Sequence, residues 1–140
     1  DENLDVNFIK NDKSNCPFYC DILICHGVLD HMLDETGEDL FNDAVRNTKP
    51  GGLIILGCKS LRHAENGNGI KIKDNLYIAA ADHQESGIPQ RFFSLSQLLS
   101  LVKNTGSLET QTIHTINHNI DPQGGCYERY VVVARKGNNH

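Results

Sequence analysis

The sequence lacks long apolar runs and lacks an excess of basic charge. None of its apolar runs approaches the roughly 20 residues that a membrane-spanning helix needs. The formal net charge of the 140 residues is -5, whereas a surface that grips nucleic acid needs a basic stripe. The composition therefore argues against a membrane protein and against nucleic acid as a partner, and it favours a small-molecule partner.

The sequence also lacks a cysteine pattern that would define a zinc site or a disulfide framework. Its five cysteines are an odd number with irregular spacing, and only Cys16 and Cys20 form a CxxxC pair. No second pair completes a zinc pattern, so we predict no metal. Buried, reduced thiols in a cytoplasmic protein are the simplest interpretation, because disulfides are rare in that compartment.

What the sequence does contain is a strand–helix–strand unit within residues 19–56. Residues 22–25 and 53–56 are continuous apolar runs, which are typical of parallel strands covered on both faces. Between them, residues 36–39 open a predicted helix. Its apolar side chains recur at helical spacing: Leu40, Phe41, Ala44 and Val45. The chain is long enough for one α/β domain with a sizeable core.

The remaining pattern predicts three further strands, a hairpin and a second helix. The strands cover residues 4–9, 108–116 and 126–134, the hairpin 70–78 and the helix 95–103. Ser94 is a good N-cap for that helix, and Gly106 stands where a C-cap glycine belongs. Residues 79–90 are predicted to be irregular. No helix separates the last two strands, so we expect them to pair antiparallel.

Polar residues follow the first apolar run, at the edge where open α/β sheets bind ligands. They are His26, Asp30 and His31. Either histidine could act as a general base, because histidine titrates near neutrality. The two could also ligate a metal, although no third ligand is near in sequence. Pocket lining or simple packing is the third interpretation.

Two adjacent pairs of residues carry weaker signals. Cys25 and His26 are neighbours on a strand, so their side chains point to opposite faces and do not form a nucleophile–base pair. Gly51 and Gly52 could cradle a phosphate, but no strand precedes them and no helix follows. We interpret them as a tight turn into the next strand, with backbone angles that side chains would forbid.

The order of these segments is that of a known enzyme family. Residues 17–32 give a strand followed by Gly-Val-Leu-Asp-His-Met, and residues 49–56 give Lys-Pro-Gly-Gly before a strand. Residues 91–106 hold a helix, and an antiparallel pair of strands closes the chain. Together they resemble the C-terminal portion of a class I S-adenosylmethionine-dependent methyltransferase. The resemblance implies a Rossmann-like sheet, mostly parallel with an antiparallel last strand, lacking the first strands.

The resemblance also implies S-adenosylmethionine as cofactor and names residues that would bind it. Asp12 matches the family's adenine-side position, with Lys13 beside it, and Cys25, His26 and Gly27 match the segment that lines the cofactor and substrate pocket. The family's glycine-rich turn after its first strand has no counterpart, nor has the acidic residue that ends its second strand. We therefore expect residues 1–140 to be a partial domain that a missing N-terminal half completes.

The activity that the resemblance implies is methyl transfer to a small molecule. His26 or His31 would serve as base where the substrate nucleophile must lose a proton. Residues 58–93 form a long insert, and such inserts are usually functional or disordered, so we predict a substrate-binding segment. Its polar candidates are Arg62, His63, Tyr77, His83 and Arg91.

Two alternatives remain open. The chain could be a non-catalytic fragment or subunit with a degenerate methyltransferase fold that acts in protein–protein association. A partner carrying the first two strands, or a second copy of the chain, would then pair with the free edge of the sheet. A different Rossmann-like enzyme, such as a dehydrogenase, is less compatible with an antiparallel last strand.

Overall fold

The computed structural model describes residues 19–118 and 125–138, which form two sheets and two α-helices. The elements are β1 (Cys20–His26), the 3₁₀ turn η1 (Leu29–His31), α1 (Asp34–Arg46), β2 (Thr48–Lys59), β3 (Ile70–Lys73), β4 (Leu76–Ile78), β5 (Pro89–Arg91), α2 (Leu95–Asn104), β6 (Leu108–His118) and β7 (Tyr127–Lys136). The strand predicted over residues 4–9 lies outside the described residues.

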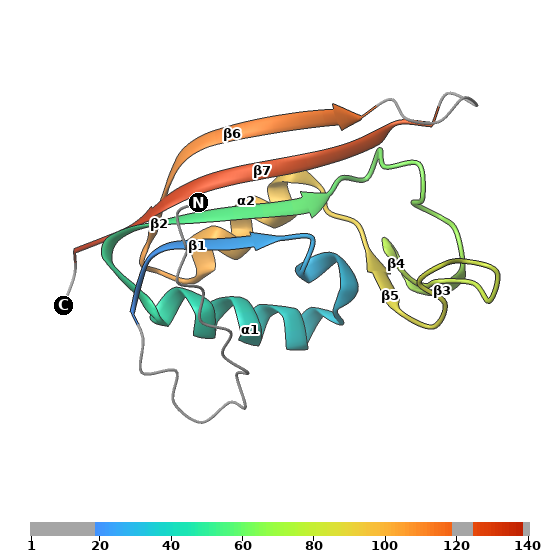
Figure 1. Ribbon diagram of the computed structural model, residues 1–140, viewed down its shortest axis with the longest axis horizontal. Coiled ribbons are helices and arrows are strands. Elements are labelled where there is room, and N and C mark those ends of the chain that lie inside the picture. Colours follow the sequence, from blue (N-terminus) through green and yellow to red (C-terminus); the bar gives the residue numbers. More distant parts are fainter. Residues whose placement is uncertain (1–18, 119–124, 139–140) are drawn as a thin grey trace, which may run out of the picture.

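The larger sheet has the strand order β1-β2-β7-β6 (Figure 1). β1 and β2 are parallel neighbours, with Leu23 opposite Ile54. β7 runs antiparallel to both β2 and β6, so β6 points the same way as β1 and β2. The predicted parallel pair and the predicted reversed last strand are both confirmed, and the reversed strand lies inside the sheet, between β2 and β6.

The predicted glycine turn is a local irregularity at the start of β2. Cys20 pairs with Thr48, but Ile22 pairs with Leu53, so residues 49–52 of β2 lie opposite the single residue Asp21 of β1. Gly51 adopts φ +76°. A Cβ on Gly52 would lie 2.9 Å from the backbone oxygens of Asp21 on β1 and of Lys49 within β2 itself. The turn therefore requires glycine for two reasons: a left-handed angle at one position and close backbone approach at the next.

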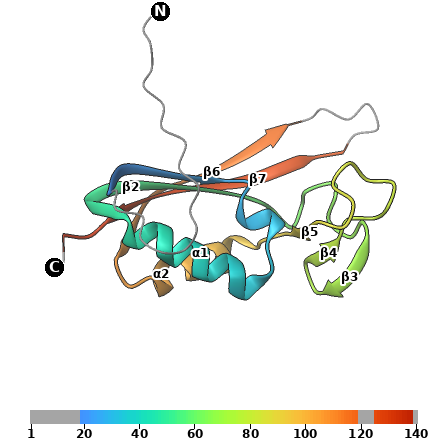
Figure 2. The same cartoon turned by 60° about the horizontal axis from the view of Figure 1, so that its bottom comes forward.

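Both helices pack on one face of this sheet (Figure 2). The core between the two layers is apolar and fully buried at its centre. It is built mainly from Phe41, Val45, Leu98 and Val102 of the helices and from Ile54, Leu56, Val132 and Ala134 of the strands. The helical spacing predicted for α1 thus identified its buried face, because Phe41 and Val45 are one turn apart.

Helix α1 begins at Asp34, two residues before the predicted start. Its N-cap residue, Leu33, makes no side-chain cap, and Asp34 and Glu35 lie in the first turn, where negative charge is favourable. Arg91 holds Asp34 through a 3.0 Å contact between its Nε and the carboxylate Oδ1. Because Arg91 is distant in sequence, the residues around the helix start could not predict this contact.

Helix α2 has the ends that its sequence predicts. Ser94 accepts a hydrogen bond from the backbone N–H of Gln97, and the Gln97 side chain accepts one from the N–H of Ser94, which completes a capping box. Gly106 follows the helix at φ +70° and donates its N–H to the carbonyl of Lys103. The N-cap and C-cap predictions are confirmed.

The opposite face of β1 is open among the described residues. Ile22 and Ile24 are 56% and 67% exposed, although the continuous apolar run predicted a strand covered on both faces. Both described helices cover the other face, on which Cys25 is buried. β1 is also an edge strand of the described sheet, since β2 is its partner on one side only.

The insert folds into a second sheet of order β3-β4-β5, beyond the carboxyl ends of β1 and β2 (Figure 1). The predicted hairpin is confirmed and turns at Asn75, which has φ +63°. The prediction of irregular structure through residue 90 is wrong at its end, because Pro89 opens β5. Proline is tolerated at the first residue of an edge strand.

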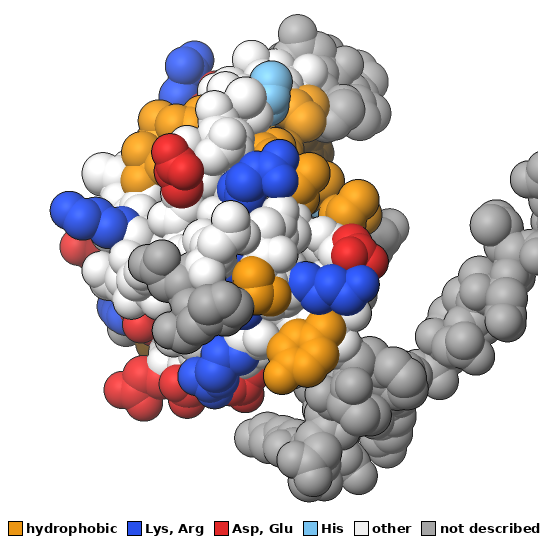
Figure 3. Space-filling view, turned by 90° about the vertical axis from the view of Figure 1, so that its left-hand side faces the viewer, with side chains coloured by type: hydrophobic (Ala, Val, Ile, Leu, Met, Phe, Trp, Pro, Cys, Tyr) orange, Lys and Arg blue, Asp and Glu red, His pale blue; other side chains and the backbone are white. Residues whose placement is uncertain are grey.

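The surface combines charges of both signs. Figure 3 shows the end of the molecule at which β1 begins, where basic and acidic side chains are interspersed rather than gathered into one field. That face offers no continuous basic stripe among the described residues. Within residues 19–118 and 125–138, neither helix has the length and apolar character needed to cross a membrane.

Candidate functional site

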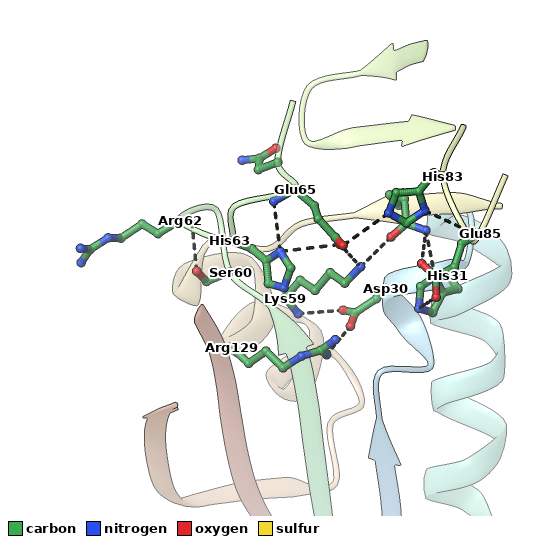
Figure 4. Close-up of polar contacts among 12 residues, drawn as sticks. Asp30, His31, Lys59, Ser60, Arg62, His63, Glu65, His83, Glu85 and Arg129 are labelled. Atoms are coloured by element: carbon green, nitrogen blue, oxygen red, sulfur yellow. Dashed lines mark hydrogen bonds and ion pairs between the residues drawn. The ribbon is translucent and has the colours of Figure 1, made fainter. Parts of the chain in front are cut away.

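A cluster of buried charges joins the carboxyl ends of β1 and β2 (Figure 4). At its base lies Asp30, whose side chain is fully buried in the turn after β1. Its Oδ1 accepts a hydrogen bond of 2.8 Å from the backbone N–H of Lys59, and its Oδ2 accepts one of 2.6 Å from Arg129. One carboxylate therefore ties together η1, the end of β2 and the start of β7.

Lys59 joins this base to the insert. Its Nζ donates hydrogen bonds of 2.7 Å to Glu65 Oε2 and to Gln90 Oε1. The residue is 4% exposed, so its charge is compensated by these contacts instead of by water. The insert is thereby fixed over the end of the larger sheet, at the edge where open α/β sheets bind ligands.

The electrostatics of the insert follow from this lysine and from burial. Burial alone would raise the pKa of Glu65, but the hydrogen bond and charge of Lys59 lower it below its ordinary value. Burial lowers the pKa of His63 to about 4, with Glu65 opposing the shift and Lys59 and Arg129 adding to it. His63 is therefore neutral near pH 7. Its Nδ1 accepts the backbone N–H of Glu65 at 3.3 Å.

Two further histidines lie on the open side of the cluster. His31 Nδ1 is 3.4 Å from Gln90 Nε2, and His31 Nε2 is 3.7 Å from Glu85 Oε1. His83 Nδ1 accepts the backbone N–H of Glu85, and its Nε2 lies 3.5 Å from Glu65 Oε1. Imidazoles and carboxylates thus alternate across the upper part of Figure 4. This arrangement can exchange protons and bind polar ligands.

A cavity of about 560 Å³ opens among these side chains. Three histidines, three carboxylates, two cations, one tyrosine and one glutamine line it: His31, His63, His83, Glu65, Asp82, Glu85, Lys59, Arg129, Tyr127 and Gln84. The lining comes from η1, β2, β7 and the insert, so the cavity exists only where these four parts meet. Its volume is in the range of small-molecule sites.

The structure separates the two histidines predicted as bases. His31 lines the cavity, whereas His26 is exposed on the face of β1 opposite Cys25. The His26 ring lies over Gly57 of β2, where a Cβ would come within 1.9 Å of its Nδ1. The two imidazoles therefore do not share one site, because His31 lines the cavity and His26 lies on the open face of β1.

The predicted cofactor residues lie at and beyond the end of β1. The Cys25 thiol is in the core, and burial, with a further contribution from Asp30, raises its pKa to about 11. A ligand reaches Cys25 only through its backbone. Gly27 turns the chain at φ +70° and donates its N–H to the carbonyl of Gly57. Asp12 and Lys13 lie outside the described residues, and the cofactor roles of all these positions stay predictions.

The insert candidates divide into two groups. His63 and His83 line the cavity, while Arg62 is largely exposed and lies 3.7 Å from Glu128. Arg91 instead pairs with Asp34 on α1, and Tyr77 packs edge-on to Phe92. The sequence did not identify the other polar residues of the cluster, which are Lys59, Glu65, Glu85, Gln90 and Arg129. For Lys59, the one available indication was that a lysine ends an apolar strand.

Within the described ranges, no three histidine, cysteine or acidic side chains are placed to hold a metal ion. The cysteines described, Cys20, Cys25, Cys58 and Cys126, are free thiols. The polar chemistry available here therefore comes from imidazoles, carboxylates and their cationic partners.

Comparison with known proteins gives matches among solved structures. No protein-family model matches the sequence, and no curated protein matches it. A Methanosarcina mazei S-adenosylmethionine-dependent methyltransferase superposes with a TM-score of 0.67 at 15% identity, over 89% of this chain and 64% of that one. The described sheet and helices match part of the Rossmann-like methyltransferase fold.

Two further methyltransferase structures agree with this fold. The 1,6-didemethyltoxoflavin-N1-methyltransferase of Burkholderia thailandensis has a TM-score of 0.60 at 18% identity, over 84% of this chain and 44% of its own. An S-adenosylmethionine-dependent methyltransferase of Clostridium acetobutylicum has a TM-score of 0.58 at 13% identity, over 89% and 61%. The chain thus spans 44–64% of the length of these three methyltransferases.

Replacing the buried carboxylate tests the base of the cluster. Asp30→Asn should lower the free energy of unfolding by about 3 kcal/mol, because it removes the charge that compensates partly buried Arg129. Urea unfolding followed by circular dichroism measures the change. Asp21→Asn is the control: its carboxylate is 80% exposed and pairs with Lys49, so it should cost less than about 1 kcal/mol. Equal losses in both variants would contradict this account of Asp30.

The lowered pKa of His63 predicts a pH dependence of stability. The folded pKa is about 4 and the ordinary value is 6.5, so the unfolded chain binds more protons between them. Stability due to His63 is complete above pH 6.5 and is lost as the pH falls toward 4. From pH 7 to pH 5, the wild type should lose roughly 1–2 kcal/mol more than His63→Gln.

Urea unfolding at both pH values measures this difference. His114→Gln is the control, because His114 is exposed on β6 and does not line the cavity. It should keep the pH dependence of the wild type. A His63→Gln variant with that same dependence would show that the imidazole is not buried in neutral form.

Proposed function

We propose that this chain takes part in the transfer of a methyl group from S-adenosylmethionine to a small molecule, as part of a larger or completed domain. The observation that carries the proposal is the cavity at the carboxyl ends of β1 and β2, on a sheet with the methyltransferase fold. In such sheets, ligands bind at this edge.

A small-molecule substrate is supported by the size and chemistry of the cavity. About 560 Å³ suits a small organic compound, and the lining offers donors and acceptors rather than a broad basic surface. One of the similar structures contains 1,6-didemethyltoxoflavin and S-adenosylhomocysteine, which are both small molecules. By analogy, we expect this chain to meet its substrate above η1 and the end of β2.

The described residues fit one side of a cofactor site. At the end of β1, the Gly27 turn carries no side chain, and the nearest atom to a Cβ there would be 3.7 Å away. His26 is exposed beside it. Bound S-adenosylmethionine would supply an electrophilic methyl group. Gly27, His26 and the Cys25 backbone would flank it, with the predicted contributions of Asp12 and Lys13 from outside the described residues.

The chain's own side chains would then bind and orient the substrate. His31 is the candidate to accept a proton from a nucleophile that must lose one, and its neighbours Gln90 and Glu85 limit how its ring can turn. The insert would cover the reacting groups and exclude water. Most of the catalytic effect would come from positioning, because a sulfonium methyl group is already reactive.

Association with another polypeptide is the second candidate function. Ile22 and Ile24 are exposed on an edge strand, and an apolar edge favours pairing with a further strand. The occupant that we propose is a polypeptide that lies parallel to β1 and covers its open face, either as a partner chain with the front strands or as a second copy.

Titration calorimetry with S-adenosylhomocysteine tests the first function. The 140-residue chain alone should bind it weakly or not at all, because the glycine-rich turn of the family is missing from it. A chain extended by its upstream coding sequence should bind it and transfer methyl groups. Tight binding by the 140 residues alone would refute the incomplete site, and no binding by the extended chain would refute the function.

Light scattering after size exclusion tests the second function. At micromolar concentration, the chain should elute as an assembly larger than a monomer. The double variant Ile22→Ser/Ile24→Ser should shift it to the monomer, because both side chains lie on the open face. Ile72→Ser is the control, since Ile72 is 54% exposed on β3 in the other sheet. A stable wild-type monomer would contradict association with a second copy.

A further inference from the structure

The charges that line the cavity do not cancel. Its two cations are already paired: Lys59 with Glu65 at 2.7 Å, and Arg129 with buried Asp30 at 2.6 Å. Of the carboxylates in the lining, Asp82 and Glu85 have no lysine or arginine partner among the described residues. The cavity therefore carries uncompensated negative charge near pH 7, which attracts a ligand of positive charge.

A chain of two hydrogen bonds holds the carboxylate of Glu85 in place, and the donor and acceptor in each bond are fixed by chemistry. The Lys59 ammonium is a donor only, so the Gln90 oxygen must accept from it. The Gln90 amide nitrogen then donates to Glu85 Oε2 at 2.8 Å. Gln90 is 3% exposed, so this relay is shielded from water. Glu85 Oε1, which lies 3.7 Å from His31 Nε2, accepts no hydrogen bond from any described residue and is the oxygen left for a ligand cation.

His63 adds an independent sign of a ligand. Its side chain is 3% exposed and lines the same cavity. Because Nδ1 accepts the Glu65 N–H, the neutral ring carries its hydrogen on Nε2. Nε2 makes no hydrogen bond to any residue that the structure describes. A ligand oxygen or nitrogen in the cavity could accept this hydrogen bond from the ring.

We propose that the cavity binds a small molecule through a protonated basic nitrogen held by Glu85, with Asp82 as second anion and His63 donating to an acceptor atom of the same molecule. The identification of this molecule as the methyl acceptor rests on the proposed function. Binding itself depends on groups that are all present in the described residues. Hydrogen bonds from a cation to a carboxylate are among the strongest in proteins, so the nitrogen dominates recognition.

Three probes with one scaffold and different end groups test the charge preference. Tyramine, tyrosol and 4-hydroxyphenylacetate end in an ammonium, a hydroxyl and a carboxylate, and each carries a phenol oxygen that can accept from His63. Titrations at pH 7 followed by NMR should show tyramine binding about tenfold more tightly than tyrosol, and 4-hydroxyphenylacetate binding most weakly. Equal affinities for tyramine and tyrosol would overturn the proposal.

Matched variants locate the effect. Asp82→Asn/Glu85→Gln should reduce tyramine affinity to that of tyrosol and leave tyrosol unchanged. Asp74→Asn/Glu109→Gln removes the same net charge from two exposed positions, Asp74 in the β3–β4 turn and Glu109 on β6. It should leave the preference for tyramine over tyrosol intact. Circular dichroism checks that each variant folds. An equal loss of tyramine affinity in both double variants would mean that overall charge alone attracts the amine, which overturns the site.

A fourth probe tests the role of His63. 2-Phenylethylamine lacks the phenol oxygen, so it should bind more weakly than tyramine, and equal affinities would overturn the contact with His63. No titration contains S-adenosylmethionine or its product. A chain that fails to bind S-adenosylhomocysteine can therefore still bind tyramine, and the two proposals fail separately.

Discussion

The buried carboxylate of Asp30 is the contact on which the arrangement of the site depends. It lies in the turn after β1, yet its two oxygens are used by β2 and β7. A charge this deep is costly unless each oxygen finds a donor, so the three segments must meet in one geometry. That geometry places Lys59 at the end of its strand, with its ammonium available to the insert.

The insert is then positioned by polar contacts as much as by packing. Lys59 binds Glu65 and Gln90, which lie on the two sides of the small sheet's hairpin in sequence. These contacts neutralise the positive charge of Lys59. The carboxylates of Asp82 and Glu85, on the open side of the cavity, therefore stay without a lysine or arginine partner among the described residues. The same network therefore fixes the loop and sets the sign of the charge that a substrate meets.

The sheet is asymmetric in a way that connects the fold to the proposed function. One face carries both described helices, and the other carries exposed Ile22 and Ile24. Continuous apolar strands are typical of sheets buried on both sides, so the open face is what a further layer would cover. The chain spans 44–64% of the length of the three methyltransferase structures, and completion of the site by further polypeptide is our proposal.

The sequence by itself determined the parallel pair, the reversed last strand, the buried face of α1 and the capping of α2. The helix face and the caps depend on residues close together in the chain, and the strand directions follow from the order of the elements. The sequence also pointed to the segment with Asp30 and His31. It placed the start of α1 two residues late and left open whether His26 or His31 would act as a base. Only the tertiary structure decided the partners of Asp30, since Arg129 is 99 residues away, and brought Glu85 to His31. Such contacts arise when strands and insert pack together, and no local periodicity encodes them.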